Sequence, residues 1–400
     1  MFRLTASLCF LFLLSLQSCS KYEPVTFASP YSSSEAIRQE VASDTGNIFR
    51  FEPAAKQYAF IGQEELAIAM WDSSRSALKR AYGWEDLDTF STDQVMRDFP
   101  NTIPAKKVIL EQSASHRFTI LNEAHHNSQH RAFTHSLLED LYDQGYRHLG
   151  AEALIVNEPA GFIDDPQQIS TESGTYVQDP EFAEMLKHAV ELGYKLFEYE
   201  ANDTIYGADR ERVQAENILR YAERFPNDKL VIHSGFGHLI ESETNKYTEW
   251  PQMGRQLHLL GGVDPLTVDQ ERYHPASSPA FEQALYRSVR PQEAVILTNG
   301  AGEAFGTNGA DLSVFHPPVG LTSPLNKFRI DRSIALDFPV LVHAFRDTDD
   351  LSVAIPFAVA EATSHEFSMS TALDKSSVII LQQADGISIR LMRSGYQALN

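Results

Sequence analysis

The sequence predicts an α/β fold, with a mostly parallel sheet, helices on both faces and a helical N-terminal extension. Three observations lead to this prediction. Between about residues 106 and 275, short apolar runs alternate with amphipathic segments of helical period. The links between them are short, which favours parallel strands joined by right-handed crossovers. Residues 276–400 hold further apolar runs at less regular spacing, which predict added strands.

The composition narrows the class of protein. A chain of 400 residues with 43% hydrophobic and 22% charged residues fits one large domain or two modest ones. Lys and Arg total 33 and Asp and Glu total 54, so the net charge is −21, which argues against nucleic acid as a partner. The only cysteines are Cys9 and Cys19, so the folded part is expected to have no disulfide and no zinc-thiolate site.

The first eighteen residues have the features of a signal peptide. Arg3 precedes an apolar run that ends in Leu16-Gln-Ser-Cys19, which resembles the lipobox of bacterial lipoproteins. This resemblance implies cleavage before Cys19, lipidation of that residue and a place in the bacterial cell envelope, at the outer membrane or the periplasmic face. The alternative is a plain secretory signal with an incidental cysteine. Residues 19–50 are mostly polar and are expected to form a tether.

The elements that follow are predicted from periodicity and from stop signals. Residues 51–105 form the helical extension, in which Gly83 is a plausible break. The α/β core of residues 106–275 has strands near 118–121, 148–154, 194–199, 229–233 and 266–268. Its helices are expected near 129–142, with Ser128 as N-cap, and near 181–192 and 209–224.

The C-terminal part is expected to pack on the same domain. Four apolar runs predict strands near 294–297, 340–343, 378–381 and 387–392. The stretch 301–336 is rich in Gly, Pro, Asn and Ser and predicts a long surface excursion.

Polar residues at the strand ends point to a functional site. The five core strands contain or lead into Glu123, Glu152, Glu200, His233 and Asp269. The carboxyl ends of parallel strands share one edge of the sheet, where ligands bind. Buried carboxylates without partners are costly, so their recurrence strand after strand predicts mutual hydrogen bonding, a metal or catalysis.

Histidines crowd the segment after the first core strand. His126 and His130 are four residues apart, as in a helical pair of metal ligands, and His125 adjoins them. These three residues are the candidate metal ligands, although their spacing matches no structural zinc pattern. Arg131 lies in the first turn of the next helix and suits a carboxylate or an anionic substrate group. His238 follows His233 in a glycine-containing loop that brings it near the same edge.

The motifs resemble those of the erythromycin esterase / ChaN / Tiki superfamily. The resemblance runs over about residues 115–270 and rests on Leu121-Asn-Glu-Ala-His-His-Asn127, Gly150-Ala-Glu-Ala153, the helix from Arg210 to Asn217, and the block from His233 to His238. An esterase-like Glu-x-x-His pairs Glu123 with His126, whereas a ChaN-like Glu-x-His pairs Glu123 with His125. The doubled histidine satisfies both pairings and leaves the branch open.

The resemblance implies ester hydrolysis without a metal, metal-assisted peptide hydrolysis, or haem binding, so no cofactor, a divalent metal and haem all stay open. The leading hypothesis is hydrolysis of an ester or amide in a small-molecule or peptide substrate, with His125 or His126 as general base oriented by Glu123 or Glu152. Arg131 and His233 or His238 would stabilise negative charge. Glu200, Arg210 and Asp269 are assigned to substrate binding. The alternative is a lipoprotein that binds haem or another iron compound.

Overall fold

A computed structural model of the protein describes residues 20–27, 29–83, 87–243, 248–307, 309–318, 325–374 and 376–399. The predicted signal peptide, residues 1–18, and the predicted lipidation site Cys19 lie outside the described residues. Within this part of the chain, no helix is both long and apolar enough to cross a membrane.

The largest sheet has eight strands in the order β2-β8-β9-β7-β3-β6-β4-β5. The strands from β9 to β5 are parallel to one another, and β8 and β2 are added antiparallel at one edge. An α/β fold is confirmed, but "mostly parallel" describes only these central strands. The bounds are β2 Asn101–Pro104, β3 Phe118–Glu123, β4 Tyr146–Ala151, β5 Lys195–Glu198, β6 Lys229–Gly235, β7 Leu266–Tyr273, β8 Val295–Thr298 and β9 Leu312–Phe315.

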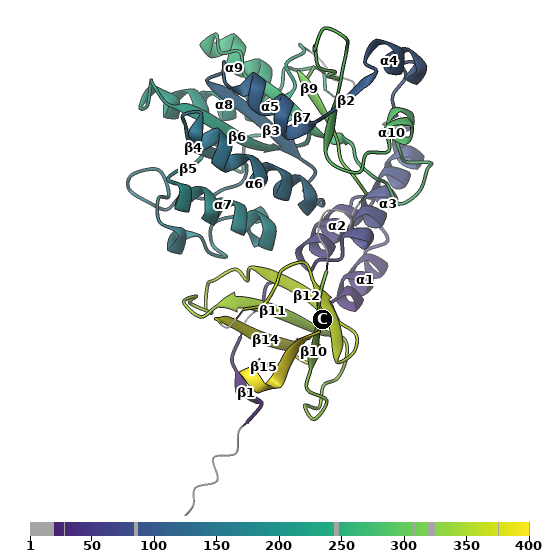
Figure 1. Ribbon diagram of the computed structural model, residues 1–400, viewed down its shortest axis with the longest axis vertical. Helices are drawn as coiled ribbons and strands as arrows, with labels where there is room; N and C mark the ends of the chain where they lie inside the picture. The colour runs from purple at the N-terminus through teal and green to yellow at the C-terminus, as the bar shows by residue number, and fades with distance from the viewer. Residues whose placement is uncertain are drawn as a thin grey trace, which may run out of the picture.

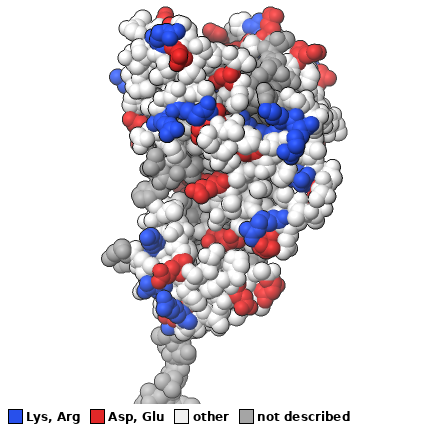
Figure 2. All heavy atoms as spheres, turned by 90° about the vertical axis from the view of Figure 1, so that its right-hand side faces the viewer, with Lys and Arg blue, Asp and Glu red and all other residues white. Residues whose placement is uncertain are grey.

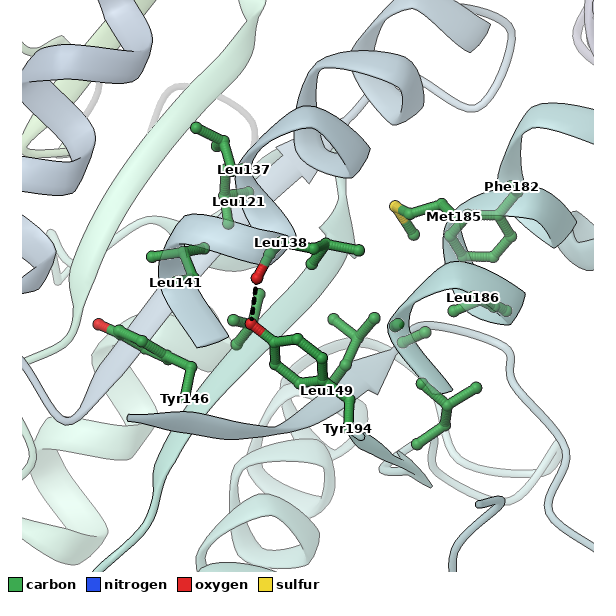
Figure 3. Packing of buried hydrophobic residues seen from close by; sticks show 14 of the residues in the cluster. Leu121, Leu137, Leu138, Leu141, Tyr146, Leu149, Phe182, Met185, Leu186 and Tyr194 are labelled. Atoms are coloured by element: carbon green, nitrogen blue, oxygen red, sulfur yellow. Dashed lines mark hydrogen bonds between the residues drawn. The ribbon is translucent and has the colours of Figure 1, made fainter. Parts of the chain in front are cut away.

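Helices cover both faces of this sheet because neighbouring strand residues point to opposite sides. On one face, Leu121 and Leu149 pack with α5, α6 and α7; on the other, Ile120 and Ile232 pack with α8 and α9. Figure 3 shows the first of these cores, where the Tyr194 hydroxyl donates to the carbonyl of Leu138 at 2.8 Å. The bounds are α5 Ala105–Ser113, α6 Ser128–Asp143, α7 Pro180–Leu192, α8 Gly207–Glu223 and α9 Met253–Gly261.

The cap of α6 differs from the prediction by one residue. Asn127 is the N-cap, and its side chain accepts from the backbone N–H of Gln129, whereas Ser128 is the first helical residue. Asp179 caps α7 in the same way through the N–H of Glu181, and Gly193, with φ of 105°, ends it. Both N-caps lie close to the site described below.

The predicted tether is wrong over most of its length. Strand β1, Tyr22–Val25, pairs antiparallel with β15 near the other end of the chain, and α1, Ser34–Ser43, is capped by Ser33. β1 is an edge strand and helix α1 is mostly exposed, so neither needs many apolar residues. The polar composition of residues 19–50 therefore suggested a tether although the segment is folded. The helical extension continues with α2 Phe51–Phe60, α3 Glu64–Tyr82 and α4 Thr92–Asp98, and Gly83 ends α3 as predicted.

The C-terminal part divides between two structures. β8 and β9 complete the large sheet, whereas residues 326–399, joined by β1, form two antiparallel sheets with a core of their own. β9 is fully buried and lies inside the predicted surface excursion of residues 301–336, which is therefore wrong there. The remaining bounds are α10 Ala284–Val289, β10 Asn326–Ile330, β11 Val340–Arg346, β12 Ala358–Ala362, β13 Glu366–Met369, β14 Ser377–Gln383, β15 Ser388–Leu391 and β16 Tyr396–Leu399.

The N-terminal helices connect these two structures (Figure 1). α1 and α2 pack on the C-terminal sheet through Tyr58 and Val359 among others. α3 continues toward the α/β unit, where Asp72 accepts from the backbone and hydroxyl of Ser277. On the face shown in Figure 2, basic and acidic side chains are interspersed over both parts, so the net charge of −21 is not gathered there into one acidic surface.

Candidate functional site

Strand order places three predicted site residues side by side. β6 lies between β3 and β4, and His233 is in register with Leu121 on one side and Ala151 on the other. Glu123 ends β3 and Glu152 directly follows β4, so the two carboxylates flank the histidine at the carboxyl edge of the sheet.

Glu123 belongs to a fully buried ion-pair cluster. Nε of Arg131 donates to Oε2 of Glu123 at 2.5 Å and Nη2 donates to Oε1 at 2.6 Å, while Nη1 donates to Asp179. The Arg131 side chain is 0% exposed, so the predicted contact between Arg131 and a substrate is wrong. Burial alone would raise the pKa of Glu123, but Arg131 and His125 outweigh it and hold that pKa well below its usual range.

His125 is the histidine that faces the site. Its Nδ1 lies 3.0 Å from Oε1 of Glu123, and its side chain is 13% exposed. Tyr176, in the short helix η2 (Tyr176–Gln178), stacks on the ring with centroids 3.9 Å apart, and Phe236 meets it edge-on at 4.8 Å. A Cβ on Gly235 would come within 2.5 Å of Nε2 of His125 and 2.8 Å of Oε2 of Glu152. Glycine at this position therefore lets the His125 ring and the Glu152 carboxylate pack directly against the backbone.

His126 and His130 point elsewhere. The ring of His126 is buried against Trp71, with centroids 4.5 Å apart, and neither of its ring nitrogens has a hydrogen-bond partner within the described structure. His130 Nδ1 accepts from the backbone N–H of Ala124 at 3.0 Å, and its Nε2 lies 3.0 Å from Nδ2 of Asn127. Burial lowers the pKa of both histidines well below the usual range.

The three candidate metal ligands therefore do not form one ligand set. His125 contacts Glu123, His126 contacts Trp71, and His130 is used in capping the turn before α6. Over the described ranges, no group of three or more His, Cys, Asp or Glu side chains is arranged to hold a metal ion.

His233 lies behind Glu123 and is 1% exposed. Its Nε2 is 3.8 Å from Oε2 of Glu123 and makes no hydrogen bond with a described residue. Burial lowers the pKa of His233 to about 4, so the ring is neutral at neutral pH. A neutral buried ring packs behind Glu123 and cannot reach a substrate at the surface.

Glu152 belongs to a second cluster, which is partly open to solvent. Nη2 of Arg210 donates to Oε1 of Glu152 at 2.9 Å. Arg210 also donates to both carboxylate oxygens of Glu200, from Nε at 2.9 Å and from Nη2 at 2.6 Å. The other carboxylate oxygen of Glu152 accepts from the backbone N–H of Gly235. Burial would raise the pKa of Glu152, but His238, His125 and Arg210 together hold it well below its usual range. Arg210 and Glu200, assigned to substrate binding, are thus paired with each other.

His238 completes this second cluster from η3 (Phe236–Leu239). Nδ1 lies 2.8 Å from Oε2 of Glu211, and Nε2 lies 3.5 Å from Oε1 of Glu152. Despite burial, these two carboxylates raise the pKa of His238 to about 10. Nη1 of Arg210 is 2.9 Å from Nε2, a contact that suits only the neutral ring. With two carboxylates this close, we assign the protonated ring at neutral pH, with Arg210 directed to Glu200 and Glu152.

Asp269 does not join the other site residues. Its Oδ1 accepts from Nδ2 of Asn122 at 2.9 Å and from the backbone N–H of Glu271 at 3.0 Å, and the residue is 4% exposed. Burial raises its pKa above the usual range. Its contacts join the middle of β7 to β3, so its assignment to substrate binding is not supported by the geometry.

Backbone strain is concentrated at this edge of the sheet. Among the described residues, Ala153, Phe236 and Arg290 are the non-glycine residues with positive φ, at 56°, 43° and 44°. Ala153 directly follows Glu152, and Phe236 directly follows Gly235. Such conformations cost of the order of 1–3 kcal/mol each and persist where the surroundings enforce them, often at functional sites.

Several site residues come from parts of the chain where no motif pointed to them. Asp179 is the N-cap of α7 and Tyr176 lies just before it. Glu211, by contrast, lies inside the helix from Arg210 to Asn217 that the sequence analysis had singled out. Lys56 on α2 and Trp71 on α3 reach the site from the N-terminal extension; Nζ of Lys56 is 5.3 Å from the ring centre of Tyr176. The cap position of Asp179 before Pro180 was the one local signal that could have drawn attention to it.

No family model matches this sequence, and no curated protein matches it. Solved structures with a similar fold include the type III effector HopBA1, at a TM-score of 0.37 and 12% identity over 55% of this chain and 97% of that one. RRSP, a MARTX toxin effector domain from Vibrio vulnificus CMCP6, matches at 0.30 and 14% identity over 61% and 56%. The C-terminal region of Pasteurella multocida toxin, which has a thiol-protease-like catalytic triad, matches at 0.29 and 11% identity over 52% and 30%.

These scores describe a remote likeness of fold and carry no weight on activity. What the chain can do chemically follows from the site itself. It combines a part-exposed imidazole held by an ionised carboxylate, a second ionised carboxylate across Gly235, and cations that neutralise both.

Proposed function

We propose that this protein hydrolyses an ester or amide bond, with His125 as general base. The observation that carries the proposal is the contact between Nδ1 of His125 and the ionised carboxylate of Glu123. A carboxylate acceptor keeps the proton on Nδ1, which leaves the lone pair on Nε2 free to accept a proton from water. The His125 side chain is 13% exposed, so a water and a carbonyl group can approach the ring from solvent.

The proton balance of the reaction is simple. As a water attacks the carbonyl carbon, Nε2 takes its proton, and the imidazolium then returns a proton to the leaving alkoxide or amine. Glu123 and Glu152, both ionised, stabilise the imidazolium between these steps. His238, 13% exposed and protonated, and Arg210, 28% exposed, are the cations near the surface that can stabilise the oxyanion.

Separate replacement of the two neighbouring histidines tests the proposal. We expect His125→Ala to lose about 10²- to 10⁴-fold in kcat/KM on any ester or anilide that the protein cleaves, the range for loss of a general base. His126→Ala is the matched control, since it removes the adjacent imidazole, and it should lose much less. A fully active His125→Ala variant, or loss confined to His126→Ala, would contradict the assignment.

A titration with hemin separates catalysis from binding. If the protein is a haem-binding lipoprotein instead, hemin should give a saturable Soret shift that depends on a site histidine. Saturable binding to the wild type that is lost in His125→Ala, together with no turnover of the substrate panel, would replace hydrolysis by uptake as the function.

Attachment to the bacterial envelope through Cys19 is part of the proposal. It is supported by the lipobox-like sequence and by the position of β1, which begins at Tyr22, so the folded part starts immediately after the cysteine. Expressed in a bacterium, the wild-type protein should partition into the detergent phase of Triton X-114, and Cys19→Ala should move it to the aqueous phase. Equal partitioning of the two would contradict lipidation at Cys19.

A further inference from the structure

We infer that Lys56 binds an anionic group of the substrate, a carboxylate or a phosphate, next to His125. The inference rests on the proposed function, because it names the class of ester or amide that the site accepts. It starts from the N-terminal helices α2 and α3, which lie over the carboxyl edge of the sheet and contribute Lys56 and Trp71 to the surroundings of the site.

The two arginines of the site are already occupied. Arg131 is fully buried and shared by Glu123 and Asp179. Arg210 is shared by Glu152 and Glu200, and His238 is held by Glu152 and Glu211. An anionic group of the bound substrate therefore competes with carboxylates of the protein for these cations, which still face the charge that develops on the reacting carbonyl.

Lys56 differs from them. It is half-buried and has no carboxylate within ion-pair distance among the described residues. Glu52, one turn earlier on α2, accepts instead from the hydroxyl of Ser74 at 3.2 Å. Burial, and then the like charge of Arg131, lower the pKa of Lys56, and the more distant charge of Glu52 only partly offsets them. A half-buried ammonium without a direct ion pair is costly, and a bound anion relieves that cost.

The position of Lys56 ties it to the reacting group. Nζ lies 5.3 Å from the ring centre of Tyr176, and the same ring stacks on His125 with centroids 3.9 Å apart. One aromatic ring thus contacts both the ammonium and the proposed base. Lys56 and His125 thus both border Tyr176, so an anion held at Lys56 would position a substrate whose chain extends along this ring toward His125.

Calorimetric titrations at low ionic strength test the inference through binding, with His125→Ala titrated beside the wild type so that cleavage of an anilide probe does not contribute. The probes are N-phenylsuccinamate, which carries a carboxylate, the corresponding neutral diamide, and phenyl phosphate. We expect the wild-type protein to bind at least one of the two anions about tenfold or more tightly than the neutral probe, as for a hydrogen bond to a charged group. Which anion binds distinguishes a carboxylate substrate from a phosphate one.

Three variants complete the test. Lys56→Met should abolish the preference for the anion, and Lys56→Arg should keep it. Lys107→Met is the matched control, because Lys107 is an exposed lysine on α5, and it should change nothing. In turnover with anionic substrates, Lys56→Met should raise KM and leave kcat nearly unchanged, as expected of a binding residue.

The outcomes separate this inference from the proposed function. His125→Ala should keep the preference for the anion while it loses activity. If the wild type cleaves no substrate, yet its preference disappears in Lys56→Met, the hydrolase proposal fails and the anion site stands. A wild type without any preference, or a Lys56→Met variant that retains it, overturns the inference.

Discussion

Two ion-pair clusters lie side by side at the carboxyl edge of the large sheet, and each joins one arginine to two carboxylates. In the buried cluster, Arg131 links Glu123 and Asp179, and the arginine is 0% exposed. In the open cluster, Arg210 links Glu152 and Glu200, and the arginine is 28% exposed. The pairing chemistry is the same, so the difference between them is access to water.

Access to water changes what each cluster can do. Arg131 cannot exchange Glu123 for a ligand, so its cluster acts as a rigid support that fixes the carboxylate against Nδ1 of His125. Arg210 is reachable from solvent, and its carboxylates can be rehydrated when the arginine moves. The open cluster can therefore respond to charge that develops on a substrate, whereas the buried one holds the base in place.

The largest effect is expected from removal of the buried arginine. Arg131→Met should lower the free energy of unfolding by about 3–5 kcal/mol, because it leaves two carboxylates buried without a counterion. Arg210→Met should lower it by only about 1–2 kcal/mol, since water can reach Glu200 and His238 still pairs with Glu152. Urea denaturation at pH 7 measures both values.

If Arg131→Met and Arg210→Met lower the free energy of unfolding by equal amounts, access to water does not distinguish the two clusters. Should Arg131→Met not fold at all, Ser128→Ala offers a milder change in the same cluster. It removes only the hydrogen bond of 2.7 Å from the Ser128 hydroxyl to Asp179 and leaves Arg131 in place. A loss below about 0.5 kcal/mol there would also contradict a cluster that is sealed from water.

The sequence predicted much of the site because strand ends can be located from local patterns. Glu123, Glu152 and His233 were expected at one edge of the sheet, and the structure places them on three adjacent strands. Strand order, however, depends on pairing between distant segments. No local pattern states that β6 lies between β3 and β4, or that β1 joins β15.

The orientation of side chains in turns could not be predicted from the sequence either. His125 and His126 are adjacent, and their opposite orientations depend on Tyr176 on one side and Trp71 on the other. Those two partners come from η2 and α3, far away in sequence. Arg131 was singled out correctly as a partner for a carboxylate, but its burial follows from Asp179 and Phe182 on α7, which only the fold brings to it.

The smaller effect is a difference in pH dependence between the clusters. His233, behind the buried cluster, has a pKa lowered by burial to about 4, so the unfolded chain takes up a proton first as the pH falls. Its contribution to stability is complete above about pH 6.5 and is lost as the pH falls toward 4. His238, in the open cluster, has a pKa raised to about 10, so its contribution is complete below about pH 6.5 and is lost as the pH rises toward 10.

Unfolding free energies measured between pH 5 and 9.5 for the wild type, His233→Gln and His238→Gln reveal both contributions. Each histidine accounts for at most about 1.4 kcal/mol per pH unit within its window. His233→Gln should flatten only the acid side of the wild-type profile, and His238→Gln only the alkaline side. If one variant flattened both sides, the two clusters would titrate as a single unit, and the division by access to water would be wrong. Independent changes on opposite sides would instead show that the neutral imidazole supports the buried carboxylate while the protonated one belongs to the surface where a substrate binds.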